Sequence, residues 1–373
     1  MAAMNRLTEA RRIVLKIGSA LLTNPNGSLH SDWLAGIAED VAQLRKAGKD
    51  VIVVSSGAIS LGRAALGLGP AALKLDEAQA AAAVGQIELA RAWRDALGAR
   101  GTTAAQLLLT WADTEERRRY LNARNTISTL LQLGAIPIIN ENDTVATTEI
   151  RYGDNDRLAA RVASMASADC LVLLSTVDGM YTKPPEHDPS AEHMSEISEI
   201  TPAIEAMAGD AGLHGTGGMV TKLEAARIAI QSGCHMVISD GRSIHPISSL
   251  IEGARATWFI ANTSPGAARK RWIAASLEPS GRIFVDAGAG AALKSGKSLL
   301  PAGVARIEGQ FERGDAVLII DLDNQELARG LSAYGDGDAR LIAGRKSREI
   351  ETILGYRGRT ALVHRDDLVV TIR

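Results

Sequence analysis

Arg12-Ile-Val-Leu-Lys-Ile17 and Val51-Ile-Val-Val54 are two short apolar runs that flank a helical pattern. The apolar residues of that pattern recur every three or four positions, on one face of a helix, at Leu34, Ile37, Val41 and Leu44. Ser31 is of a type that caps helix starts, and Gly48 is of a type that ends helices. The stretch therefore predicts strand, helix and strand in succession, the unit from which parallel sheets are built.

The same order recurs three more times in the first two-thirds of the chain. Each repeat is a helical pattern that ends at or near a glycine and is followed by an apolar run: Gly98 and 104–109, Gly134 and 136–139, Gly233 and 236–238. A glycine just past a helix end can take the left-handed conformation that such an end often needs. We therefore predict an α/β fold with an open, mainly parallel sheet sandwiched by helices.

The pattern changes near residue 262. Turn-forming and basic residues lead through Pro279-Ser280-Gly281 into short apolar runs that turns separate. Such runs are typical of a β-rich domain, and we expect one helical piece near Arg340–Leu354. Because 373 residues exceed what one compact core usually holds, we predict a first domain at 1–265, a linker at 266–279 and a small β-rich domain at 280–373.

Composition narrows the class of protein. With 23% charged residues and a formal net charge of −2, the chain has no global electrostatic basis for binding nucleic acid or membranes. No apolar stretch approaches the roughly 18 residues of a membrane span, and residues 1–12 lack the apolar block of a secretory signal. We expect a cytoplasmic protein whose Cys170 and Cys234 are small buried residues, in preference to a disulfide or a reactive thiol.

Small and polar residues directly follow four of the predicted strands. In parallel sheets, ligands bind beyond the carboxyl ends of the strands. A plain tight turn accounts equally well for the stretch after residue 54, whereas the run of polar residues after 139 is harder to explain without a ligand. The four stretches are Gly18-Ser19-Ala20, Ser55-Ser56-Gly57-Ala58, Asn140-Glu141-Asn142-Asp143 and Ser175-Thr176-Val177-Asp178-Gly179.

A glycine-rich stretch, Gly215-Thr-Gly-Gly-Met-Val-Thr-Lys222, opens an amphipathic pattern that extends to Ile230. Glycines let backbone N–H groups approach a phosphate, and the start of a helix favours negative charge. A flexible loop with a surface lysine is the alternative. The P-loop pattern has a near miss at Ser295-Gly-Lys-Ser298, but residue 291 is alanine and no buried strand precedes it, so we expect an exposed turn there.

Lys16 lies inside an apolar strand just before Gly18. Its side chain must either extend to water or point into the cleft at the strand end. Two further clusters, Asn140–Asp143 and Gly153–Asp156, are rich in Asp and Asn, which suits a zwitterionic substrate because carboxylates accept from an ammonium group and amides donate to a carboxylate. The second cluster can also be only a helix cap.

Together and in this order, these stretches resemble the amino acid kinase family. They are Val14-Leu-Lys-Ile-Gly-Ser, Ser55-Ser-Gly-Ala-Ile, Ile138-Ile-Asn-Glu-Asn-Asp-Thr-Val-Ala, Gly153-Asp-Asn-Asp, Gly179-Met-Tyr-Thr and the stretch that ends at Lys222. The C-terminal part is similar to a PUA domain, through Leu299-Leu-Pro-Ala-Gly-Val and Phe311-Glu-Arg-Gly-Asp-Ala-Val. The resemblance covers nearly the whole chain and implies the amino acid kinase fold with a PUA-like domain.

The resemblance also implies roles for the matching residues. Lys16 and Lys222 would flank the transferred phosphoryl group as catalytic residues, and Asp156 would orient both lysines. The substrate would be held by Ser56, Asp143 and Asn155. ATP would be held by Lys16, Ser175, Thr176, Thr216, Gly217, Gly218, Met219, Val220, Thr221 and Lys222. Many members of the family have an acidic residue where this chain has Thr176.

The activity that the resemblance implies is ATP-dependent phosphorylation of the γ-carboxylate of L-glutamate to L-glutamyl 5-phosphate, the first step of proline biosynthesis. No general base is needed, because a carboxyl group with a pKa near 4 is already ionised at neutral pH. Mg²⁺ would arrive on the ATP phosphates. Feedback by proline, transfer of the labile product to glutamyl phosphate reductase and a homo-oligomer are further expectations.

Two other functions stay open. A different acid kinase of the same fold would act on N-acetylglutamate, aspartate or carbamate, but an N-acetylated substrate has no ammonium group for the acidic clusters to bind. An RNA-binding protein is the second, since PUA-like domains elsewhere bind RNA. Residues 280–373 hold 14 Lys and Arg against 13 Asp and Glu, which is a poor electrostatic footprint for nucleic acid.

Overall fold

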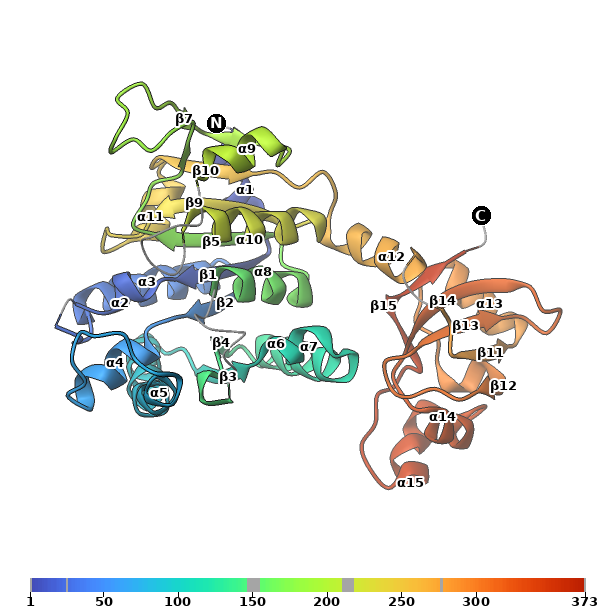
Figure 1. The fold of residues 1–373 in the computed structure, drawn as a ribbon. Coiled ribbons are helices and arrows are strands. Elements are labelled where there is room, and N and C mark those ends of the chain that lie inside the picture. Colours follow the sequence, from blue (N-terminus) through green and yellow to red (C-terminus); the bar gives the residue numbers. More distant parts are fainter. Residues whose placement is uncertain (1, 25, 146–154, 210–217, 276–277, 372–373) are drawn as a thin grey trace. The chain divides into compact units, whose positions relative to one another are not determined.

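The computed structural model describes residues 2–24, 26–145, 155–209, 218–275 and 278–371. The chain forms two compact units, Met1–Pro265 and Gly266–Arg373 (Figure 1). Each unit has its own sheet and its own hydrophobic core. They are therefore described separately.

An eight-stranded sheet organises the first unit, in the order β3-β4-β2-β1-β5-β9-β10-β8. Strands β3, β4, β2, β1, β5 and β9 pair in parallel, whereas β10 pairs antiparallel with β9 and parallel with β8. The predicted mainly parallel sheet is confirmed. The strands are β1 Arg12–Ile17, β2 Asp50–Ser55, β3 Ala104–Leu109, β4 Ile136–Glu141, β5 Cys170–Ser175, β8 Glu196–Ile197, β9 His235–Asp240 and β10 Ala256–Phe259, with a separate pair, β6 Met180–Tyr181 and β7 His193–Met194.

Helices cover both faces of this sheet (Figure 1). Ile13 and Leu15 of β1 belong to the core beneath α3, α5 and α11, whereas Val14 belongs to the core beneath α7, α8 and α10. Burial on both faces is why the strands are continuous apolar runs. The helices are α1 Ala2–Glu9, α2 Ser19–Leu22, α3 Ser31–Lys46, α4 Ala58–Ala65, α5 Leu75–Gly98, α6 Trp111–Glu115, α7 Arg117–Gln132, α8 Asn155–Ala166, α9 Pro202–Met207, α10 Met219–Gln231 and α11 Pro246–Ile251, with a 3-10 turn, η1, at Asp143–Val145.

The predicted helix ends are largely correct. Gly48, Gly134 and Gly233 have φ values of 79°, 76° and 80°, a conformation that favours glycine. Helix α5 does end at Gly98, but the left-handed glycine after it is Gly101, at φ 67°. The predicted cap of α3 was wrong by one position, since His30 precedes the helix and Ser31 is its first residue.

A five-stranded sheet, in the order β12-β11-β13-β14-β15, forms the second unit. Its core includes Ile283, Val317, Ile319 and Leu362. The strands are β11 Gly281–Val285, β12 Val304–Gly309, β13 Ala316–Ile320, β14 Glu326–Ser332 and β15 Val363–Val370; the helices are α12 Pro265–Ala275, α13 Ala287–Lys294, α14 Asp336–Ile342 and α15 Ile350–Leu354, with 3-10 turns η3 Pro301–Gly303 and η4 Ser347–Glu349.

The helices of the second unit differ from the prediction in three places. The single helical piece expected near Arg340–Leu354 is two helices, α14 and α15, joined by η4. Helix α13 was missed because its sequence is rich in glycine, but Asp286 caps its start by accepting from the N–H of Ala289 at 2.7 Å. The linker predicted at 266–279 contains most of α12, which an ion pair of 2.6 Å between Arg269 and Asp367 fastens to β15.

Candidate active site

A buried carboxylate lies between two lysines at the carboxyl edge of the large sheet. Asp156, in the first turn of α8, is 2.5 Å through Oδ1 from Nζ of Lys16 and 3.1 Å through Oδ2 from Nζ of Lys222. Asp156 is 1% exposed and Lys222 is 6% exposed. The structure therefore brings together the three residues that the sequence predicted as catalytic, from β1, α8 and α10.

The charge of Asp156 is stabilised by its neighbours. Burial by itself raises the pKa of this carboxyl, but the ammonium groups of Lys16 and Lys222 outweigh that effect and hold the pKa below its ordinary value. The carboxylate is thus ionised at neutral pH and fixes both ammonium groups at one place. Two cations held this close can meet a highly charged anion such as a nucleotide phosphate.

Glycine borders this centre on the strand side. A Cβ atom at Gly18 would lie 3.8 Å from Nζ of Lys16 and 4.0 Å from the carbonyl oxygen of Leu174. The backbone can therefore come close to whatever binds the lysine. The turn that follows β2 is built similarly, with Gly57 at φ 111°, a conformation that other residues rarely adopt.

The glycine-rich stretch leads into α10. Gly218 precedes the helix, Met219 and Val220 begin it, and Thr221 donates from its hydroxyl to the carbonyl of Gly218 at 2.8 Å. Lys222 therefore lies in the first turn, as the pattern predicted. Thr216 and Gly217, predicted ATP contacts, lie outside the described residues, as do Gly153 and Asp154.

Two of the three residues predicted to hold the substrate, Ser56 and Asn155, lie beside this centre. Asn155, adjacent to Asp156, donates from Nδ2 to Oγ of Ser56 at 2.6 Å and to Oδ1 of Asn140 at 3.3 Å. Asn155 and Ser56 are thus brought together. Asn140, which sequence reasoning quoted but did not select, joins them because β4 ends next to β2 in the sheet.

Asp143, in the turn η1, is the third predicted substrate residue. Burial raises the pKa of its carboxyl to about 6. The pKa of Asp156 shifts in the opposite direction, because two lysines lie beside it, whereas within the described part of the chain burial is the cause that acts on Asp143. A cationic ligand group would supply a compensating charge.

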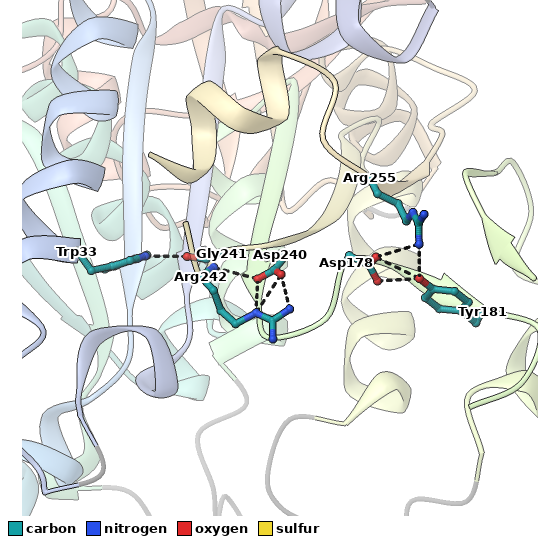
Figure 2. Close-up of polar contacts among 7 residues, drawn as sticks. All are labelled: Trp33, Asp178, Tyr181, Asp240, Gly241, Arg242 and Arg255. Carbon is teal, nitrogen blue, oxygen red and sulfur yellow. Dashed lines mark hydrogen bonds and ion pairs between the residues drawn. The ribbon is translucent and has the colours of Figure 1, made fainter. Parts of the chain in front are cut away.

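Ser175 ends β5, and Thr176 follows it as an exposed residue. The carbonyl of Ser175 accepts from the N–H of Gly241, which joins the ends of β5 and β9. Nearby carboxylates are already paired: Asp240 with Arg242, and Asp178 with Tyr181 and Arg255 (Figure 2). This region therefore adds little unpaired negative charge that would repel a nucleotide.

The described residues contain no group of three or more His, Cys, Asp or Glu that could hold a metal ion. The near-miss P-loop at Ser295–Ser298 is confirmed as an exposed turn: Gly296, at φ 78°, follows the end of α13. Both cysteines are free and buried, as predicted, and burial raises the pKa of the Cys170 thiol to about 12. Neither thiol is a reactive nucleophile.

Comparison with known proteins identifies the family of each part of the chain. Residues 11–240 match the model of the amino acid kinase family, and residues 281–354 match that of the PUA domain. The chain belongs to the amino acid kinase family and has a C-terminal PUA domain.

Several proteins that are similar to the chain belong to one narrower class within the family. It is 60% identical to the glutamate 5-kinase of Agrobacterium fabrum (strain C58), over 98% of this chain and 94% of that protein. It is 58% identical to the glutamate 5-kinase of Sinorhizobium fredii (strain NGR234) and to glutamate 5-kinase 1 of Rhizobium meliloti (strain 1021), in each case over 99% of this chain and 94% of the relative. In the described part of the chain, no helix is long and apolar enough to cross a membrane.

Proposed function

We propose that this protein transfers the γ-phosphoryl group of ATP to the γ-carboxylate of L-glutamate, forming L-glutamyl 5-phosphate as the first step of proline biosynthesis. The observation that carries the proposal is Asp156 bridging Lys16 and Lys222 at the edge of the parallel sheet. The full-length similarity to glutamate 5-kinases supports the choice of substrate.

The reaction depends on the placement of the two substrates and on the stabilisation of negative charge, and it needs no proton transfer. The γ-carboxylate of glutamate is ionised at neutral pH, so it can attack the γ-phosphate directly. Negative charge on the phosphoryl oxygens and on the departing ADP is stabilised by the ammonium groups of Lys16 and Lys222. Asp156 holds both ammonium groups in place through its two carboxylate oxygens, and it takes no proton itself.

ATP is proposed to lie between the start of α10 and the ends of β5 and β9. The first turn of α10 offers backbone N–H groups to phosphate, and Lys222 projects from that turn. Thr216–Lys222 and Ser175-Thr176 are the proposed contacts. Mg²⁺ would be bound by the phosphate oxygens of ATP, where it supplies further positive charge.

Glutamate is proposed to bind between Ser56, Asn155 and Asp143. Hydrogen-bond donors and acceptors are both available there. Asn155 has an amide, Ser56 has a hydroxyl, and Asp143 has a carboxylate whose pKa is raised to about 6 by burial. An ammonium group would pair with the carboxylate of Asp143 and donate to the amide oxygen of Asn155, and the hydroxyl group of Ser56 would donate to a carboxylate of the substrate.

An ADP-release assay on the full-length protein tests the proposal, with L-glutamate, N-acetylglutamate, aspartate and carbamate as acceptors. We expect turnover with L-glutamate to exceed turnover with N-acetylglutamate or carbamate by at least about a hundredfold, because a site built for an ammonium group rejects ligands that lack it. Aspartate keeps the ammonium group, so its turnover tests the fit of the shorter side chain. Equal turnover of N-acetylglutamate would contradict the proposal. Adding proline to the same assay tests for feedback inhibition.

Three further features are proposed with this activity. An acyl phosphate is labile in water, which favours direct transfer to glutamyl phosphate reductase. We also propose a cytoplasmic homo-oligomer. RNA binding by the PUA domain has weak electrostatic support, because the charges of residues 280–373 nearly cancel.

A further inference from the structure

A chain of hydrogen bonds, here called the amide relay, joins helix α5 to the proposed glutamate site. Oε1 of Gln86 accepts from Nδ2 of Asn140 at 2.8 Å. Oδ1 of Asn140 accepts from Nδ2 of Asn155 at 3.3 Å, and the same Nδ2 donates to Oγ of Ser56 at 2.6 Å. The relay therefore connects α5, β4, α8 and the end of β2.

The relay has a direction, because a side-chain amide accepts at one end and donates at the other. Gln86 presents its oxygen, so Asn140 turns its NH₂ group toward Gln86 and its oxygen toward Asn155. Asn155 must then direct its own NH₂ group to Asn140 and Ser56. The orientations of the three amides are thus coupled, so loss of the acceptor oxygen at Gln86 would let Asn140 and Asn155 reverse.

The end of the relay is an acceptor without a donor. Among the described residues, Oδ1 of Asn155 is buried and has no hydrogen-bond partner, and the residue is 7% exposed. A buried acceptor left in this state is unfavourable and rare in folded proteins. A ligand with a donor group would satisfy it.

Helix packing fixes the origin of the relay. Gly85, next to Gln86, lies against α4: a Cβ atom there would be 1.8 Å from the carbonyl oxygen of Ala58. A Cβ atom at Gly62 of α4 would in turn be 1.7 Å from the carbonyl oxygen of Ala81. Because the two helix backbones touch, Gln86 is held at a fixed distance from the turn that contains Ser56 and starts α4.

We propose that Gln86 is a positioning residue that makes Asn155 present an oxygen, and not an NH₂ group, to the α-ammonium group of the substrate. This inference rests on the proposed function, since it concerns the same substrate site. An ammonium group has three N–H donors, whereas an acylated nitrogen has one and is bulkier. The amide relay therefore selects for a free amino acid over an N-acylated one.

Two substitutions of Gln86 separate orientation from packing. Gln86→Met keeps the length of the side chain but removes the acceptor, so Asn140 and Asn155 can reverse. Gln86→Glu keeps an acceptor and so keeps the relay. The matched control is Gln132→Met, an exposed position at the end of α7. Gln86→Lys, which offers donors only, serves as a second disruptive variant if Gln86→Met does not fold.

The measurements are the KM for L-glutamate and the inhibition constant of glutarate, which has both carboxylates but no ammonium group. In Gln86→Met we expect the KM for glutamate to rise about tenfold, since a hydrogen bond to a charged group is lost. The inhibition constant of glutarate and the KM for ATP should change less than about twofold, because neither ligand uses that bond. Gln86→Glu and Gln132→Met should resemble the unaltered enzyme.

If Gln86 had only a structural role, Gln86→Met would weaken the binding of glutamate, glutarate and ATP together. That result would overturn the inference. An unchanged KM for glutamate in Gln86→Met would overturn it as well. Failure of the proposed function is distinguishable, because the unaltered enzyme would then not phosphorylate glutamate at all.

Discussion

The proposed active site has a phosphate side, formed by Lys16, Asp156 and Lys222, and an acceptor side, formed by Ser56, Asp143 and Asn155. The charged groups of the two sides differ in how they are paired. On the phosphate side, Asp156 is paired with Lys16 and Lys222, and these two cations hold its pKa below the ordinary value although burial opposes them. On the acceptor side, Asp143 has a pKa raised to about 6 by burial, and Asn155 keeps an unpartnered oxygen among the described residues. The charges of the phosphate side are paired before a ligand binds, whereas a ligand would pair the polar groups of the acceptor side.

This difference indicates how binding and chemistry are divided. The phosphate side is pre-organised, which electrostatic stabilisation of a transition state requires. The acceptor side is destabilised until a cationic group arrives, which favours a substrate with a free ammonium group. Changes on the phosphate side should therefore affect stability and kcat, and changes on the acceptor side should affect KM.

The largest effect is expected for Asp156→Asn. The buried ammonium group of Lys222 and the part-buried one of Lys16 would then lack their counter-ion, which should lower the free energy of unfolding by about 3–5 kcal/mol in urea titrations. The pKa of Asp156 lies below its unfolded value, so its stabilising contribution is present above pH 4 and lost as pH falls through the lowered pKa. The variant should lack that acid-dependent component. Asp95→Asn, at an exposed ion pair on α5, is the control, with an expected change below about 1 kcal/mol.

Lys222→Ala should lower kcat with little change in the KM for glutamate. Removing one cation from the transition state should cost on the order of 3 kcal/mol, about a hundredfold in rate, and Lys16→Ala should behave similarly. Steady-state kinetics measure both constants. Lys297→Ala, in the exposed turn after α13, should leave kcat unchanged. An unaltered kcat in Lys222→Ala would remove this lysine from the mechanism.

Glutamate binding should depend on the ionisation of Asp143. Because its pKa is raised to about 6, the carboxyl becomes protonated as pH falls through 6 and can no longer pair with an ammonium group. The KM for glutamate should therefore rise about tenfold between pH 7 and pH 5, whereas Asp143→Asn should have a higher KM that is flat over the same range. A pH profile of KM in the unaltered enzyme that matches the variant would contradict the assignment.

The smallest effect is expected for a residue that holds the acceptor side in place from behind. Trp93 of α5 donates from Nε1 to Oγ of Ser55 at 3.0 Å, next to Ser56. Trp93→Phe should raise the KM for glutamate by roughly fivefold at nearly constant kcat, the equivalent of about 1 kcal/mol for one hydrogen bond. Trp272→Phe, at a 43% exposed position in α12, should leave KM unchanged. A fall in kcat with constant KM would place Trp93 with the phosphate side instead.

Much of the first unit was predictable because its signals are local. Strands β1 and β2 are apolar runs buried on both faces, and left-handed glycines such as Gly48 and Gly134 follow the helices α3 and α7. The second unit was less predictable. Strand β14 has a weak local signal, because Glu326–Ser332 mixes polar residues with apolar ones and includes Gly330, and its place is decided by pairing with β13 and β15.

By itself, the sequence determined the parallel α/β class, the division near residue 265 and the chemical types of the active-site residues, since each depends on neighbouring positions along the chain. Only the tertiary structure decided that Asp156 meets two lysines, that the pKa of Asp143 is raised and that Gln86 accepts a hydrogen bond from Asn140 in the amide relay. Nothing near Gln86 in its alanine-rich helix signals this role. The reason is physical: charge pairing, desolvation and hydrogen-bond direction depend on which distant segments the sheet and the helix packing bring together.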